Sequence, residues 1–125
     1  MEQEANRLFD DAREKLKEAN QELYKPEEDV VSYLVCKNAQ HAIVNYLKGF
    51  LMQKGIDPTN FKTIDSLYQQ CKTINKNFEE VDLSSFACKY DILSSMACNE
   101  VSKVDNCCEV AAKVDLFFRQ EKIIL

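Results

Sequence analysis

Five polar residues of the chain are spaced so that one face of a helix would present them together. They are Lys37, Asn38, His41, Asn45 and Lys48. Separations of three, four and seven residues place side chains on one stripe of an α-helix. Ammonium, amide and imidazole groups in a groove can hold an anion or a nucleotide, so this stripe is our candidate ligand or nucleotide-binding site. The alternative is an ordinary solvated helix face.

No catalytic residue is assigned from the sequence. A Ser-His-Asp or Cys-His arrangement would have to use His41, the only histidine in the chain. Lysines 37 and 48 share its helical face, which carries no carboxylate to orient the imidazole and no evident nucleophile. Glycine occurs only at positions 49 and 55, so no glycine-rich phosphate loop can be written. The carboxylate pairs Glu27-Glu28 and Glu79-Glu80 are typical of a helix start and a loop.

The six cysteines favour core packing over a disulfide framework or a metal site. They stand at positions 36, 71, 88, 98, 107 and 108. No signal-peptide pattern precedes them, and at least three, Cys36, Cys71 and Cys108, fall on apolar stripes. None forms the C-x-x-C spacing of a zinc site, so we expect neither metal nor cofactor. Reduced, buried thiols predict a cytoplasmic protein.

Charge is unevenly distributed along the sequence. Residues 1–29 hold five Lys/Arg against ten Asp/Glu, residues 30–78 hold six against two, and residues 79–125 hold five against nine, for a net charge of −5. This pattern lacks the dense basic patch of a nucleic-acid-binding protein. No apolar run reaches the roughly 18 residues of a membrane span, so we expect no membrane contact.

Apolar periodicity predicts the elements that must position these groups. Residues 3–24 carry one narrow stripe, and residues 26–54 carry an apolar arc of roughly 200°, too wide for one neighbouring helix. Gly55 is expected to end the second helix. A third helix is expected over residues 64–78 with Thr63 or Thr59 as its cap, a short one over 84–93, and a last one over 98–122. Two glycines and two prolines in 125 residues favour long helices in one domain, residues 1–125.

One segment resembles a known family. Residues 39–51, AQHAIVNYLKGFL, are similar to the second-helix signature of HEPN domains, in which A-x-x-A and apolar residues are followed by lysine, leucine and glycine. Residues 62–67, KTIDSL, resemble the start of the third HEPN helix, with lysine where the family often has histidine. The resemblance covers almost the entire chain.

The resemblance implies an all-α, up-and-down bundle of four to five helices that commonly forms a homodimer. Many HEPN relatives work beside a small nucleotidyltransferase, as a substrate-binding subunit or as the toxin of a toxin–antitoxin pair. Nuclease members use an R-x4–6-H motif near the start of the last helix. Between Lys89 and Leu125 this chain has no histidine, and its one arginine there is Arg119. No ribonuclease site can therefore be transferred.

The sequence thus predicts a HEPN-like binding or scaffold subunit without catalysis of its own, as the partner of a nucleotidyltransferase or of a nucleotide. Two alternatives stay open. One is a diverged HEPN ribonuclease or toxin, and the other is a simple homo-oligomerisation module.

Overall fold

The chain folds as a bundle of α-helices. The computed structural model describes residues 2–26, 32–81 and 101–123, and these parts contain helices and connections but no strand. The α-helices are α1 (Glu2–Leu23), α2 (Ser32–Gln53), α3 (Ile64–Ile74) and α4 (Val101–Gln120). Two short 3-10 helices, η2 (Pro58–Asn60) and η3 (Lys76–Glu80), flank α3. The predicted all-α bundle is confirmed.

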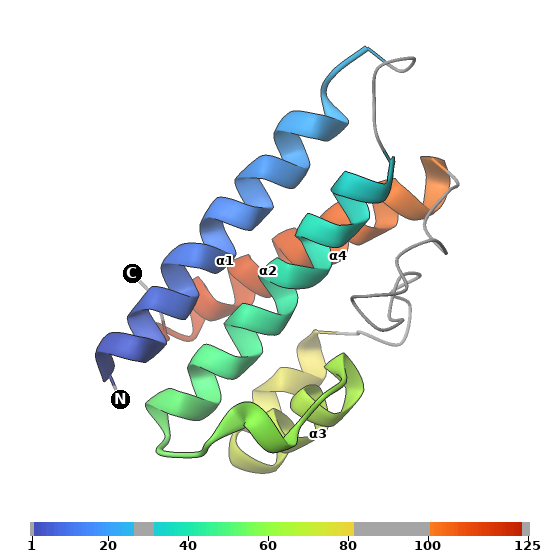
Figure 1. Cartoon of the computed structure of the whole chain (residues 1–125). Coiled ribbons are helices and arrows are strands. Elements are labelled where there is room, and N and C mark those ends of the chain that lie inside the picture. The colour runs from blue at the N-terminus through green and yellow to red at the C-terminus, as the bar shows by residue number, and fades with distance from the viewer. Residues whose placement is uncertain (1, 27–31, 82–100, 124–125) are drawn as a thin grey trace.

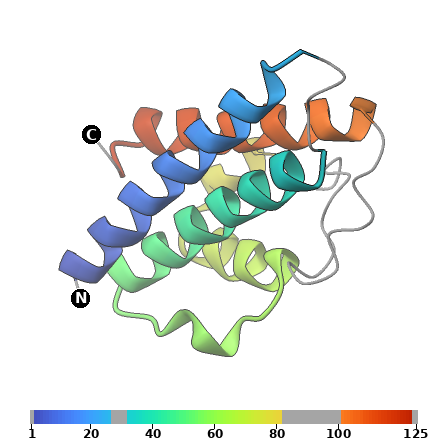
Figure 2. The ribbon, with the colours of Figure 1, turned by 45° about the horizontal axis from the view of Figure 1, so that its top comes forward.

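Helix α2 lies at the centre of the bundle. It contacts α1, α3 and α4. Figures 1 and 2 show α1 running antiparallel beside α2, α4 crossing one face of this pair at an angle, and α3 on the other side of α2. Several α2 side chains on different faces are almost fully buried: Val35, Ala39, Ala42, Ile43, Tyr46, Leu47, Phe50 and Leu51. The wide apolar arc of the sequence therefore covers the contacts with three other helices.

Small residues let α1 and α2 approach closely. Ala5, Ala12 and Ala19, each seven residues from the next, are fully buried on one face of α1. On α2, a Cβ atom added to Gly49 would lie 2.5 Å from Cε1 of Phe9. The absence of a side chain at Gly49 thus makes the room that the Phe9 ring occupies.

A cluster of aromatic rings joins the helices. The ring of Phe118 on α4 lies 5.9 Å from Phe9, 5.1 Å from Tyr46 and 5.7 Å from Phe78, between ring centroids. Phe118 is fully buried. These rings come from α1, α2, η3 and α4, so the cluster fixes the position of α4 against the other elements.

Local signals explain two of the helix ends, the C-terminus of α2 and the N-terminus of α3. Gly55 follows α2 with φ of 79°, and the Ile56 N–H donates to the Leu51 carbonyl at 2.9 Å, as in a Schellman cap. Thr63 caps α3 and forms a capping box with Ser66, which confirms the first of the two predicted caps.

The third helix ends earlier than the sequence predicts. Asn75 adopts an extended conformation after α3, and its side chain accepts a hydrogen bond from the N–H of Asn77. The chain then continues as η3, which still buries Phe78. The prediction of a helix over 64–78 is therefore wrong for its last turn. The predicted helix over 84–93 and the first residues of the predicted last helix, 98–100, lie outside the described residues.

Cys71 and Cys108 are buried, as predicted. Burial raises the pKa of the Cys71 thiol to about 12, so it stays protonated. Within residues 2–26, 32–81 and 101–123, no group of metal-binding side chains is found. In the same parts of the chain, no helix has the length and apolar character to span a bilayer.

The Gly49→Ala variant tests the close contact of α1 and α2. Helix propensity alone predicts that alanine stabilises this position by about 1 kcal/mol. The added methyl group would instead collide with Phe9, which is 3% exposed and packed against Phe118. We therefore expect a net loss of roughly 1–3 kcal/mol in the free energy of unfolding, measured by urea denaturation. A gain in stability would contradict this packing.

Candidate functional site

The structure places the five predicted site residues along one edge of the contact between α1 and α2. All five side chains, Lys37, Asn38, His41, Asn45 and Lys48, are partly buried. The Asn45 amide donates a hydrogen bond to the carboxylate of Asp11 on α1. This part of the stripe is therefore engaged with a neighbouring helix.

His41 lies in a basic environment on this edge. Partial burial lowers its pKa, and Lys15 of α1 together with Lys37 and Lys48 lowers it further, while Asp11 raises it. The imidazole is therefore neutral at pH 7. A neutral ring beside lysines can accept a proton. Asp11 lies near it, but no carboxylate of the described residues forms a hydrogen bond that would orient the ring as in a catalytic triad.

A cavity lies between α1 and α4, and we refer to it as the α1–α4 groove. Its volume is about 660 Å³, within the range of small-molecule sites. Helix α1 contributes side chains spaced by three and four residues, and α4 contributes two that are one turn apart. The lining residues are Arg13, Leu16, Lys17, Asn20, Gln21, Tyr24, Lys25, Asp115 and Arg119.

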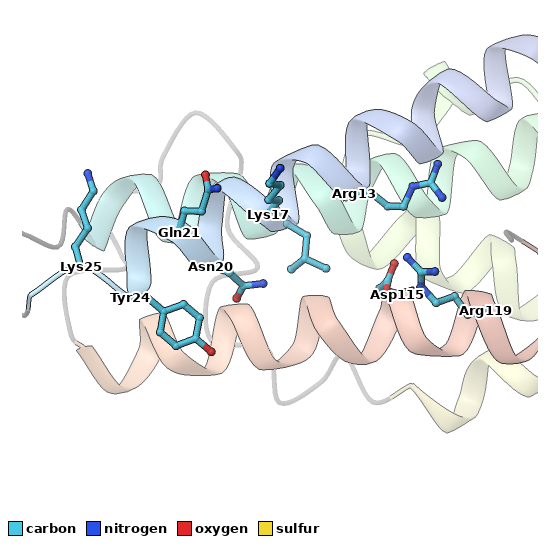
Figure 3. A pocket seen from close by; sticks show the side chains of 9 residues that line it. Arg13, Lys17, Asn20, Gln21, Tyr24, Lys25, Asp115 and Arg119 are labelled. Atoms are coloured by element: carbon cyan, nitrogen blue, oxygen red, sulfur yellow. Dashed lines mark hydrogen bonds and ion pairs between the residues drawn. The ribbon is translucent and has the colours of Figure 1, made fainter.

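The groove has a charged end and an aromatic end. Figure 3 shows Arg13 of α1 facing Asp115 and Arg119 of α4, with Tyr24, the residue that follows α1, reaching toward α4. Between these ends the Asn20 amide also points toward α4, whereas Lys17, Gln21 and Lys25 extend along the outer side of α1. Tyr24 is 84% exposed. An exposed ring of this kind can stack on a flat ligand.

Asp115 connects the groove to the core. Its Oδ1 accepts a hydrogen bond from the hydroxyl of Tyr46, and its Oδ2 accepts one from Nε of Arg119 at 2.8 Å. Burial and the bond to Asp115 raise the pKa of Tyr46, so the phenol remains a donor. The bond to Asp115 also raises the pKa of Arg119, which stays cationic. The Arg119 guanidinium at this end of the groove therefore keeps its positive charge near neutral pH.

Two other basic groups of the groove have acidic neighbours. Arg13 forms an ion pair with Asp10 one turn earlier on α1. Lys25 Nζ lies 3.1 Å from the carboxylate of Glu22. Lys17 makes no ion pair with any residue that the structure describes. The groove thus retains positive charge, although most of its cations are partly neutralised.

Sequence reasoning missed the groove. It identified one narrow apolar stripe over residues 3–24 and assigned no binding role to Arg13, Lys17 or Lys25. The available signal was the run of basic and amide side chains at positions 13, 17, 20, 21 and 24, which follows helical spacing and ends in an exposed tyrosine. This pattern indicates a binding groove only when the position of α4 opposite α1 is known.

The Tyr46→Phe variant tests the link between Tyr46 and Asp115. Loss of a hydrogen bond to a charged group should lower the free energy of unfolding by roughly 1.5–3 kcal/mol near pH 7. Because the pKa of Tyr46 is higher in the folded state than in the unfolded state, the folded state favours the protonated phenol. The contribution of Tyr46 to the free energy of unfolding therefore falls as pH rises above 10, the ordinary pKa of tyrosine. The stability difference between wild type and variant should narrow by about 1 kcal/mol between pH 10 and pH 11, measured by denaturant titration. A difference that stays constant would contradict the raised pKa.

Comparison with known families gives one result. The family model of the HEPN domain matches residues 5–112, which include most of α1, the whole of α2 and α3, and part of α4. Neither the curated proteins nor the solved structures include a match. Because the matched segment spans most of the 125 residues, the chain belongs to the HEPN domain family.

Proposed function

We propose that this chain is a non-catalytic HEPN binding subunit that holds a phosphate-bearing ligand of nucleotide type in the α1–α4 groove. The observation that carries this proposal is the lining of the groove, a cavity of about 660 Å³ with Arg13 and Arg119 at one end and two further basic side chains, Lys17 and Lys25, on its outer side. Arginine binds phosphate through a rigid fork of N–H groups, and two arginines face each other at one end.

The other groove residues suit the remainder of a nucleotide. Tyr24 offers an exposed aromatic face, and the Asn20 amide, which points toward α4, can donate and accept hydrogen bonds. Stacking on an aromatic side chain tolerates any base, because every base has a π-face. A ligand with its phosphate between Arg13 and Arg119 and its base toward Tyr24 would use both ends of the groove.

We further propose that the domain is cytoplasmic, forms a homodimer and serves beside a small nucleotidyltransferase. Membership of the HEPN family supports this role, since many members work in that setting. Leu116 of α4 is 54% exposed and offers apolar surface to a partner. A plain oligomerisation module is the alternative. Titration with AMP separates the two functions, because such a module would not bind the nucleotide.

The Arg13→Gln variant tests the groove as a phosphate site. Isothermal titration with AMP should show binding to the wild type, and affinity should fall roughly 10-fold in the variant because one charge-assisted hydrogen bond is lost. Arg7→Gln is the matched control, because Arg7 is an exposed arginine of the same helix outside the groove lining. Absence of AMP binding, or equal losses in the two variants, would refute the proposed site.

A diverged ribonuclease is the second candidate function. The observation in its favour is the lowered pKa of His41, which leaves a neutral imidazole among Lys15, Lys37 and Lys48. The predicted binding site along this edge would then contact a phosphodiester.

A cleavage assay distinguishes the two functions. Under the binding proposal, a labelled single-stranded RNA should stay intact after prolonged incubation with micromolar protein, read by denaturing gel electrophoresis. Cleavage that the His41→Ala variant abolishes, while its thermal melting remains that of the wild type, would favour the ribonuclease.

A further inference from the structure

We infer that the α1–α4 groove selects ligands with a single phosphate over polyphosphates, and that Asp115 is the residue that sets this preference. The inference rests on the proposed function, and it goes further by naming the charge class of the ligand. Three observations support it: the charges of the groove, the fixed position of Asp115, and the charge of the whole chain.

The groove carries little net charge for a phosphate site. Of its four basic side chains, three have a carboxylate partner, and these partners are Asp10, Glu22 and Asp115. Counting these seven groups leaves one net positive charge. A phosphate monoester carries about 1.5 to 2 negative charges at pH 7, so its charge matches the net charge of the groove more closely than that of a di- or triphosphate does.

Asp115 differs from the other two carboxylates in its position. It is the acidic side chain among the described residues that line the groove, and only 19% of its side chain is exposed. The buried Tyr46 holds one of its oxygens and Arg119 holds the other. The carboxylate is therefore held in place, and a phosphate between Arg13 and Arg119 must lie beside it.

Repulsion from a fixed carboxylate increases with the charge of the ligand. Each additional phosphate adds negative charge near Asp115, whereas the further cations, Lys17 and Lys25, extend along the outer side of α1. The whole chain has a net charge of −5, which also opposes a strongly anionic ligand. In a purely cationic groove, a second or third phosphate would increase the binding affinity. Both effects reduce that increase here.

The inference is tested by titrating the full chain with AMP, ADP and ATP. Titrations are run without magnesium at one ionic strength. We expect the wild type to bind AMP at least as tightly as ATP. The Asp115→Asn variant should bind AMP roughly 3-fold tighter and ATP roughly 10-fold tighter or more, which shifts the ratio of the two affinities about 3-fold toward ATP, because the removed repulsion is larger for the more charged ligand.

Glu109→Gln is the matched control. Glu109 pairs with Lys113 one turn later on the same helix, as Asp115 pairs with Arg119, but it does not line the groove. This control changes the total charge equally and should leave the order of the three nucleotides as in the wild type. Asp115→Glu, which keeps the charge, should keep that order too.

Two results would overturn the inference. One is a wild type that binds ATP several-fold tighter than AMP, a measurement that needs no variant and is therefore independent of any folding defect. The other is a folded Asp115→Asn variant that keeps the wild-type ratio of AMP affinity to ATP affinity. Failure of the proposed function looks different: none of the three nucleotides would bind, or Arg13→Gln would bind all of them as the wild type does.

Discussion

The packing of Phe118 is the interaction on which the arrangement of the bundle depends. Its ring contacts rings from α1, α2 and η3 and is fully buried. Asp115 and Arg119 lie about 60° and 100° from Phe118 around α4, on the same side. Burying Phe118 in the core therefore turns both charged groups toward α1, where they form one wall of the groove.

The opposite wall follows from the contact between α1 and α2. Gly49 admits the ring of Phe9, and Phe9 in turn packs against Phe118. With the Phe9 face of α1 held inward, Arg13, Asn20 and Tyr24 lie on the adjoining face, next to α4. The two walls of the groove are thus positioned by the same aromatic cluster.

The fold was largely predictable because its signals are local or periodic. The wide apolar arc of α2 indicated a central helix, and Gly55 and Thr63 marked helix ends through their own backbone chemistry. The end of α3 was missed because Phe78 stands four residues after Ile74 and continues the period. Apolar spacing cannot detect a break in which the buried residue lies on a following 3-10 helix.

The groove could not be predicted in the same way. Its walls are about 90 residues apart in the sequence, and the angle at which α4 crosses α1 depends on the complete core. The five residues of the predicted stripe all lie on α2, but the sequence did not show that α1 would lie beside them and engage Asn45. Tyr46 illustrates the same limit. Tyr46 is fully buried, and a buried hydroxyl is unfavourable unless it has a hydrogen-bond partner. Phenylalanine would therefore be the expected residue at such a position. Asp115, from a distant helix, supplies that partner. One carboxylate thus satisfies a polar group of the core and sets the charge of the groove, so stability and the proposed ligand preference cannot vary independently at position 115.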